Sequence, residues 1–158
     1  MAEKAFQDYY PDQLSHCYGC GRLNTAGLQI KSYWDGDESV CEYTPKPYHT
    51  ALPGCVYGGL IASLIDCHGT GTASAAAYRA ENREMDTSPP LRFVTGSLQV
   101  EFLRPTPIGG PLVVRARIKE IKGRKVVVTS ELHAGGQICA RGEVVAIQVP
   151  EEQLNSLL

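Results

Sequence analysis

The sequence of 158 residues has little of several features that would assign it at once to a class of protein. It lacks an apolar run near the ~18 residues that a membrane-spanning helix needs, so we expect no membrane partner. Its first ten residues, MAEKAFQDYY, lack the apolar centre of a signal peptide, and we expect a cytoplasmic protein. Charged residues make up only 20% and the net charge is −2, which argues against nucleic acid as a partner.

The six cysteines are accompanied by neither a second CxxC nor paired histidines. The single CxxC, Cys17 and Cys20 beside His16, falls short of the about four ligands of a structural zinc site, so we expect no metal. It lies among turn residues, whereas a redox CxxC begins a helix after a strand. We therefore expect local packing there and reduced, largely buried thiols elsewhere. The run at 69–73, GTGTA, lacks the lysine of a phosphate loop, and we expect no cofactor.

Turn residues and apolar periodicity predict two strands, one long helix and then four strands. After a polar leader (1–16), the helix is expected at about 58–78, loosening near two glycines at 69 and 71. The strands are expected at 28–34, 39–44, 92–103, 111–121, 125–134 and 137–149. Because so apolar a helix must be covered, an antiparallel sheet of five to six strands should curl around it, giving a single α+β domain over 1–158. One face would remain open, which predicts a dimer or larger homo-oligomer.

The segment 53–72, PGCVYGGLIASLIDCHGTGT, places a double glycine at the start of this helix and one carboxylate inside it. Burial of an unpaired carboxylate costs several kcal/mol, so Asp66 is a candidate for chemistry. The free N–H groups and positive dipole at Gly58 and Gly59 suit a developing oxyanion. Two simpler alternatives stay open: Thr70 or a backbone amide could satisfy Asp66, and the glycines could merely allow a close turn.

Helix geometry separates these two candidate groups within one chain. Gly59 and Asp66 are seven residues apart, so they share a face but lie roughly 10 Å apart along the axis. A carbonyl held at Gly59 would be out of reach of the same helix's carboxylate, which needs ~3 Å or one bridging water. Asp66 would then act on a substrate held by a second copy of the chain.

Three motifs, CYGCGxxNxxGL, HTxxPGxVYGGLIASLID and TGSLQVEFLRPTPIGGPLVVRARI, resemble those of hotdog-fold acyl-CoA thioesterases, most closely the phenylacetate-pathway branch. The resemblance implies a long central helix wrapped by a curved antiparallel sheet, with active sites between two protomers. It implies a backbone oxyanion donor at Gly58 or Gly59, Asp66 as base or nucleophile, and assistance from the Thr95 hydroxyl. The family usually has histidine where this chain has Tyr57, which bears on substrate orientation and rate.

Four further residues are candidates for substrate binding, and three of them have a simpler alternative. Tyr57 and His49 lie just before the glycines, although His49 could be an exposed loop residue. Arg104 could meet a coenzyme A phosphate or be ordinary surface charge. His68 points about 200° away from Asp66 on the helix, which also fits a packed or interface histidine.

These features predict an acyl-CoA thioesterase that releases a carboxylate and free coenzyme A. Two alternatives stay open: a hotdog domain that binds acyl-CoA without hydrolysing it, and an enoyl-CoA hydratase of the same fold, because fold alone does not assign chemistry. The sequence does not fix the acyl chain, the choice between base and nucleophile for Asp66, or the choice between homodimer and homotetramer.

Overall fold

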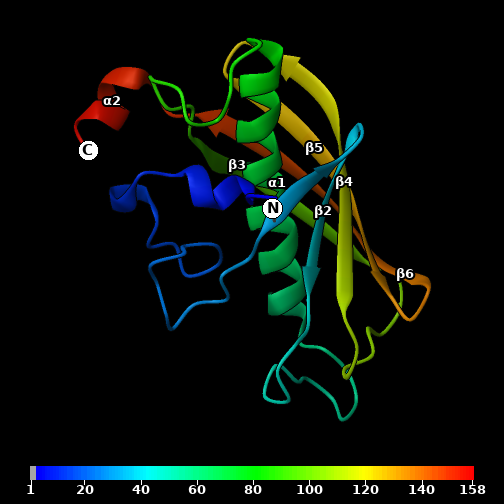
Figure 1. Cartoon of the computed structure of the whole chain (residues 1–158). Coiled ribbons are helices and arrows are strands. Elements are labelled where there is room, and N and C mark those ends of the chain that lie inside the picture. Colours follow the sequence, from blue (N-terminus) through cyan, green and yellow to red (C-terminus); the bar gives the residue numbers. More distant parts are fainter. Residues whose placement is uncertain (1–2) are drawn as a thin grey trace.

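The long helix lies in the curve of a single sheet in the computed structural model, which describes residues 3–158 (Figure 1). Helix α1 spans Gly58–Ala80, and a short helix, α2 (Glu151–Asn155), follows the last strand. Two 3-10 turns, Phe6–Tyr9 and Asp12–Leu14, precede the sheet. The strands are β1 (Ser32–Asp35), β2 (Glu38–Tyr43), β3 (Phe93–Phe102), β4 (Leu112–Lys122), β5 (Lys125–Ala134) and β6 (Gln137–Gln148). Among the described residues, no helix has both the length and the apolar character that crossing a membrane requires.

The six strands form one antiparallel sheet in the order β1-β2-β4-β5-β6-β3, and β1 and β3 are its edges. Three hairpins link β1 to β2, β4 to β5 and β5 to β6, at the turns that the sequence predicts. Their glycines have the positive φ angles that other residues adopt with strain, as at Gly36 (64°) and Gly123 (60°). The predicted α+β hotdog arrangement, one long helix wrapped by a curved antiparallel sheet, is confirmed.

Helix α1 continues through its glycines to Ala80, so the expected loosening near 69 and 71 was wrong. A Cβ on Gly69 would lie 2.6 Å from a methyl group of Val144 in β6. Gly142 of β6 likewise faces Ile65, with 2.4 Å between the side chain and a Cβ built there. The glycines therefore allow helix and sheet to approach closely, and this packing outweighs their low helix propensity.

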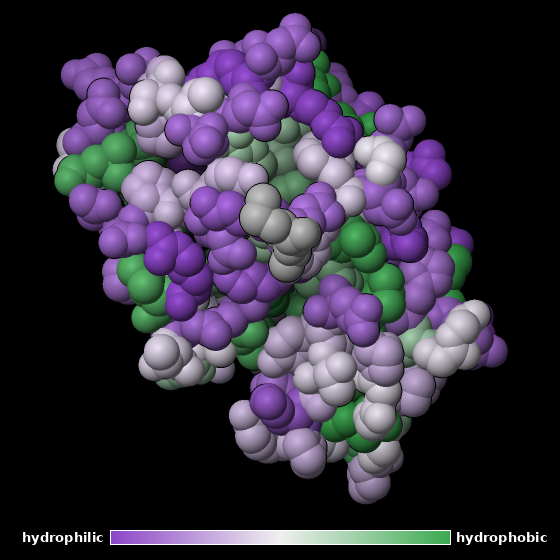
Figure 2. Space-filling model, in the orientation of Figure 1, coloured by the Kyte–Doolittle hydropathy of each residue, from purple (hydrophilic) through white to green (hydrophobic). Residues whose placement is uncertain are grey.

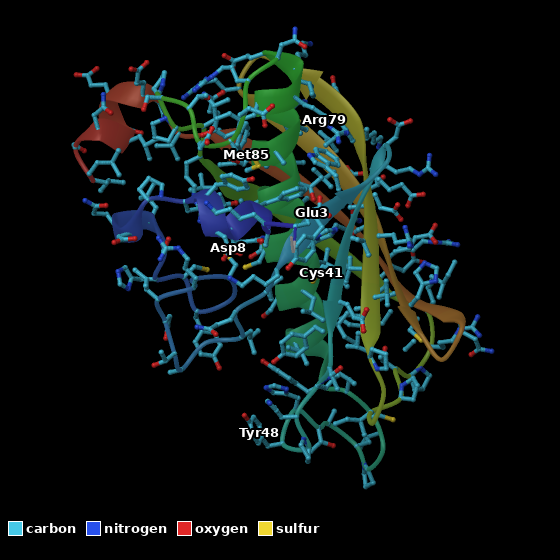
Figure 3. The ribbon with its side chains drawn as sticks, viewed as in Figure 1. Glu3, Asp8, Cys41, Tyr48, Arg79 and Met85 are labelled. Atoms are coloured by element: carbon cyan, nitrogen blue, oxygen red, sulfur yellow. The ribbon has the colours of Figure 1, made fainter. Side chains whose placement is uncertain are left out.

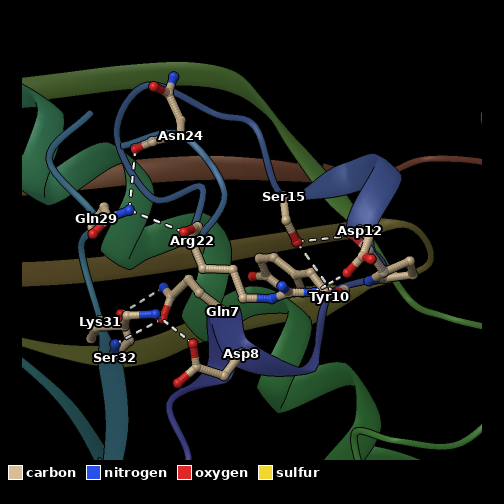
Figure 4. A network of polar contacts seen from close by, with 11 residues as sticks. Gln7, Asp8, Tyr10, Asp12, Ser15, Arg22, Asn24, Gln29, Lys31 and Ser32 are labelled. Atoms are coloured by element: carbon tan, nitrogen blue, oxygen red, sulfur yellow. Dashed lines mark hydrogen bonds and ion pairs between the residues drawn. The ribbon is translucent and has the colours of Figure 1, made fainter. Parts of the chain in front are cut away.

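Part of the segment expected as a polar leader packs on α1, through the 3-10 turn Phe6–Tyr9. Phe6 and Gln7 are buried, and Gln7 both donates to Ser32 Oγ (3.0 Å) and accepts from the Ser32 backbone N–H (2.8 Å). This segment lies on the side of α1 away from β4 and β5 (Figure 1), in the polar network of Figure 4. The face of the molecule that carries it is mainly hydrophilic (Figure 2).

Strand β1 begins four residues later than predicted. The N–H groups of Leu28 and Ile30 donate to the carbonyl oxygens of Tyr18 (2.8 Å) and Gly19 (3.0 Å) instead of joining the sheet. Residues 28–30 are thus held by the turn that contains the CxxC motif. Ser32 is the first residue to pair with β2.

Candidate active site

Asp66 projects from the middle of α1 towards the edge strand β3. Its carboxylate accepts a hydrogen bond of 2.5 Å from the hydroxyl of Thr95. Thr70, the expected simple partner, donates to the backbone carbonyl oxygens of Asp66 and Cys67 (both 3.3 Å), not to the carboxylate. Asp66 is half-buried and Thr95 is exposed, so the full burial expected for this carboxylate is not seen within one chain. The structure brings these two predicted residues together and leaves them open to solvent.

A bulge at Gly96 turns Thr95 towards the helix. The pairing of β3 with β6 shifts by one residue between Thr95, opposite Ala146, and Ser97, opposite Val145. Directly paired residues share a face of the sheet, so Thr95 lies on the helix face with the buried Ala146. After the bulge the alternation changes, and Leu98 lies on that same face opposite Val144. Regular alternation would place only one of Thr95 and Leu98 there.

The helix start is open and lies under a tyrosine ring. Gly58 and Gly59 are the first two residues of α1, so their N–H groups have no partner within the helix. A Cβ on Gly59 would lie 2.1 Å from the Tyr57 hydroxyl oxygen, which shows that the phenol packs over this turn. The Tyr57 side chain is itself 50% exposed. The ring therefore lies where a substrate carbonyl would approach the predicted oxyanion donors.

Arg104 and the start of α1 line the same groove. The groove has a volume of about 430 Å³, and its lining includes Gly58, Ile61, Phe102, Arg104 and Thr106. Arg104 is exposed, so its guanidinium is free to meet an anionic group of a ligand. Thr106 is a candidate that sequence reasoning missed: its side chain is buried, and its hydroxyl has no hydrogen-bond partner within residues 3–158. Its place in the Pro-rich corner 105–111 gave no periodic signal that could have identified it.

His49 lies in the loop before α1, at the end of the molecule where Figure 3 labels Tyr48. Its Nδ1 accepts a hydrogen bond from the Lys46 backbone N–H (3.0 Å), and its carbonyl accepts one from the Tyr57 N–H (3.0 Å). Partial burial, with a smaller contribution from the Lys46 charge, lowers the pKa of His49. Its side chain is half-buried against Tyr48, with 4.8 Å between ring centroids. His49 thus fixes the loop that carries Tyr57.

His68 lies apart from the other candidates. Its side chain has 0% exposed surface, and its Nδ1 and Nε2 atoms are hydrogen-bonded to the hydroxyls of Ser32 (2.8 Å) and Ser39 (3.0 Å). Burial lowers its pKa to about 4, so the imidazole is neutral near neutral pH. The expected substrate contact does not fit this placement, and the alternative of a packed histidine does. The reason is the 100° step of the helix, which turns His68 towards β1 and β2 and away from Asp66.

Comparison with known proteins places the chain in a family. The model of the thioesterase superfamily matches residues 53–140, which include the helix start, Asp66 and Thr95. The chain belongs to the thioesterase superfamily. A crystal structure of a thioesterase superfamily protein from Shewanella loihica is 49% identical, with a TM-score of 0.68, over 89% of this chain and 100% of that one. The E. coli PaaI protein of the phenylacetic acid degradation operon shares the fold at 18% identity, with a TM-score of 0.63, over 78% and 81% of the two chains.

Two curated relatives are longer proteins. Acyl-coenzyme A thioesterase THEM4 of Xenopus laevis is 27% identical over 108 residues, 68% of this chain and 43% of the relative. The protein of the same name from Bos taurus is 25% identical over 126 residues, 72% of this chain and 46% of the relative. The chain thus spans less than half the length of these relatives.

Proposed function

We propose that this protein is an acyl-CoA thioesterase in which Asp66 drives hydrolysis and the start of α1 holds the thioester carbonyl. The observation that carries the proposal is the Asp66–Thr95 hydrogen bond, on a helix whose first two N–H groups have no hydrogen-bond partner in the described part of the chain. The names of the curated relatives support the substrate class. The groove beside Gly58, with Arg104 at its wall, supports an anionic ligand that reaches the helix start.

The chemistry consumes one water for each thioester. A backbone N–H at Gly58 or Gly59 polarises the carbonyl and stabilises the oxyanion that develops on it. In one route, Asp66 removes a proton from water as the water oxygen adds to the carbonyl carbon, and coenzyme A leaves as thiolate. In the other, Asp66 itself adds, coenzyme A leaves, and water then hydrolyses the acyl anhydride. Both routes yield a carboxylate and free coenzyme A, and the Thr95 hydroxyl orients Asp66 in either.

The separation of roughly 10 Å between Gly59 and Asp66 along α1 favours a site shared between two chains. Strand β3 supports this arrangement, because its outer edge has no strand partner among residues 3–158. Leu98 and Phe102 lie on its helix face and are nevertheless 39% and 56% exposed. We infer that a second copy of the chain covers this face and places its own helix start near Asp66. This is the homodimer, or dimer of dimers, expected from the sequence.

One observation favours a second candidate, an acyl-CoA-binding protein without hydrolysis. The Tyr57 ring packs over Gly59, where the carbonyl of a substrate would have to enter. If the ring does not move aside, a thioester could occupy the groove and remain intact. The hydratase alternative needs an acid and a base acting together, and the enclosed position of His68 gives it no support.

The test is free-thiol release from a panel of short, medium, long and aromatic acyl-CoA substrates, with wild type compared with Asp66→Asn. We expect turnover by the wild type and a loss of about a thousandfold in the variant, with little change in its melting temperature. The isosteric Asn keeps a hydrogen-bond acceptor for Thr95, so the loss would report on the carboxylate itself.

The best substrate of the panel would identify the acyl chain. Turnover that survives in Asp66→Asn on that substrate would overturn the catalytic role of Asp66. Absence of thiol release from every substrate, together with a melting temperature raised by one of them, would favour the binding protein. In that case Tyr57→His is the first variant to examine.

A further inference from the structure

Three thiols meet where the N-terminal segment crosses α1. Cys17 and Cys20 come from the CxxC turn, and Cys67 comes from the helix, 47 residues or more along the chain. The three sulfur atoms lie within 4.8 Å of one another, with 3.9 Å between Cys17 Sγ and Cys67 Sγ. A tetrahedral Zn²⁺ with Zn–S bonds of about 2.3 Å holds its sulfur atoms about 3.8 Å apart. The Cys17–Cys67 distance is therefore that of two ligands around one ion, and the Cys20 sulfur lies within 4.8 Å of both.

The backbone of the CxxC turn packs closely around the thiols. Cys17, Gly19 and Cys20 form one tight turn, in which the Gly21 N–H donates to the Cys17 carbonyl oxygen (2.8 Å). A Cβ on Gly19 would lie 2.3 Å from Cys67 Sγ. A Cβ on Gly21 would lie 2.5 Å from the Cys17 backbone nitrogen. Glycine at both positions thus lets the turn wrap around Cys17 while Cys67 enters from the helix.

A cation balances the charge of such a site. The Arg92 guanidinium lies 4.0 Å from the centroid of the Tyr10 ring and close enough to Cys20 for their charges to interact. Three thiolates with one divalent ion carry a net charge of −1, and Arg92 offsets it in a half-buried site. Cys17 is exposed, which provides a path for an ion to enter.

We propose that Cys17, Cys20 and Cys67 bind one Zn²⁺ ion per chain, with a solvent-derived fourth ligand. Within residues 3–158 no further His, Cys, Asp or Glu joins the three, so the fourth position faces the solvent beside Cys17. Three thiols release three protons on binding and supply the soft ligands that zinc accepts. The ion clamps the N-terminal segment to α1 at the residue next to Asp66.

This proposal departs from the expectation of no metal. That expectation counted the ligands of one sequence motif, and the third ligand comes from a helix that sequence spacing does not connect to it. A disulfide between two of the cysteines is the rival use of the cluster. It would leave the third thiol unused, whereas one ion engages all three.

The experiment uses the whole protein, reduced and freed of metal with a chelator, and titrates it with Zn²⁺ against a chromophoric competitor. Co²⁺ is titrated in parallel, because thiolate coordination gives it charge-transfer absorption. We expect one ion per chain and a higher melting temperature on Zn²⁺ addition. Cys67→Ala and the exposed Cys17→Ser should each weaken binding by about a hundredfold or more, since each removes a ligand. Circular dichroism verifies that both variants fold.

The matched control is Cys55→Ala, which removes a half-buried thiol outside the cluster and should bind Zn²⁺ as the wild type does. Three outcomes would overturn the proposal. One is the absence of stoichiometric binding by the reduced wild type. Another is binding that Cys17→Ser and Cys67→Ala leave unchanged. The last is an as-isolated mass lower by two hydrogens that reduction restores, with no Zn²⁺ uptake by the reduced protein, which would establish a disulfide instead.

Discussion

Asp66 and His68 are only two positions apart on helix α1, but they lie on different sides of it and differ in burial and hydrogen bonding. Asp66 is half-buried, with one side-chain hydrogen bond to the exposed Thr95. His68 is fully enclosed between the helix and strands β1 and β2, with both ring nitrogens bonded to serine hydroxyls. The sheet edge at β3 is open, while the sheet at β1 and β2 is closed over the helix by the N-terminal segment.

The difference shows how a single helix can carry one side chain that is available to a ligand and another that stabilises the fold. A polar group with every partner supplied by the protein stabilises the fold and has no capacity left for a ligand. A group with one partner and exposed surface keeps that capacity. Because the helix turns by 100° per residue, neighbours in sequence reach these two environments without any change in the backbone. The following predictions test this division.

After the loss expected for Asp66→Asn, the largest effect is expected at the open side, from removal of one backbone N–H. Gly58→Pro deletes the donor at the first helical position, where proline is tolerated, and Tyr57 already has the extended angles that precede proline (φ −68°, ψ 136°). We expect thioester turnover to fall by about a hundredfold or more, as for loss of an oxyanion donor. Gly58→Ala keeps the N–H and places its Cβ 3.4 Å from Phe102, so it should retain activity. Full activity in Gly58→Pro would assign the oxyanion to Gly59.

Mixing the inactive variants sharpens this result. Subunits of Gly58→Pro and Asp66→Asn refolded together should regain about a quarter of wild-type activity, because half of the dimers are mixed and each holds one intact site. No recovery, with mixed dimers shown by tagged subunits, would mean that each chain acts alone.

At His68, on the closed side of α1, we expect an effect on how the free energy of unfolding depends on pH. Burial lowers the pKa of His68 to about 4 from an ordinary 6.5, so the unfolded chain takes up the proton at higher pH than the folded one. The free energy of unfolding should therefore fall by about 3 kcal/mol between pH ~6.5 and pH ~4 and change little through this group outside that range. Urea unfolding of wild type and His68→Gln across this range isolates the contribution, because only the wild type titrates at position 68. Parallel curves for the two proteins would contradict it.

The smallest effect is expected from the partner of Asp66. Thr95→Val keeps the shape of the side chain and removes the hydroxyl, so kcat should fall by about tenfold, the value of one hydrogen bond to a charged group. Thr95→Ser should retain most of the activity. Chemical unfolding should show a change below about 0.5 kcal/mol, because Thr95 is exposed. A large loss of stability in Thr95→Val would show that Thr95, like His68, mainly stabilises the fold.

Sequence reasoning succeeded where the signal is local. The turns at Gly36 and Gly123, the start of α1 at Gly58 and the succession of helix and strands along the chain follow from residue type and periodicity, and the structure confirms them. The contact between Asp66 and Thr95 could be anticipated from the sequence, because the family motifs include both positions.

It failed where contacts join distant segments. Nothing in the spacing of Cys17 and Cys20 indicates Cys67, because the meeting depends on how residues 3–31 pack on the helix. The same packing buries Phe6 and Gln7 in a stretch whose composition reads as polar. The uninterrupted helix at Gly69 depends on its close contact with Val144, which propensity does not include.

The bulge at Gly96 constrains how this chain can change in length. Strand β3 presents its odd-numbered residues to the helix before Gly96 and its even-numbered residues after it. Deletion of this glycine would restore simple alternation, and either Thr95 or the Leu98–Phe102 side would then turn to the opposite face. One glycine thus links the orientation of a candidate catalytic hydroxyl to that of an apolar surface. Homologues that differ in length at this point would have to rebuild both together.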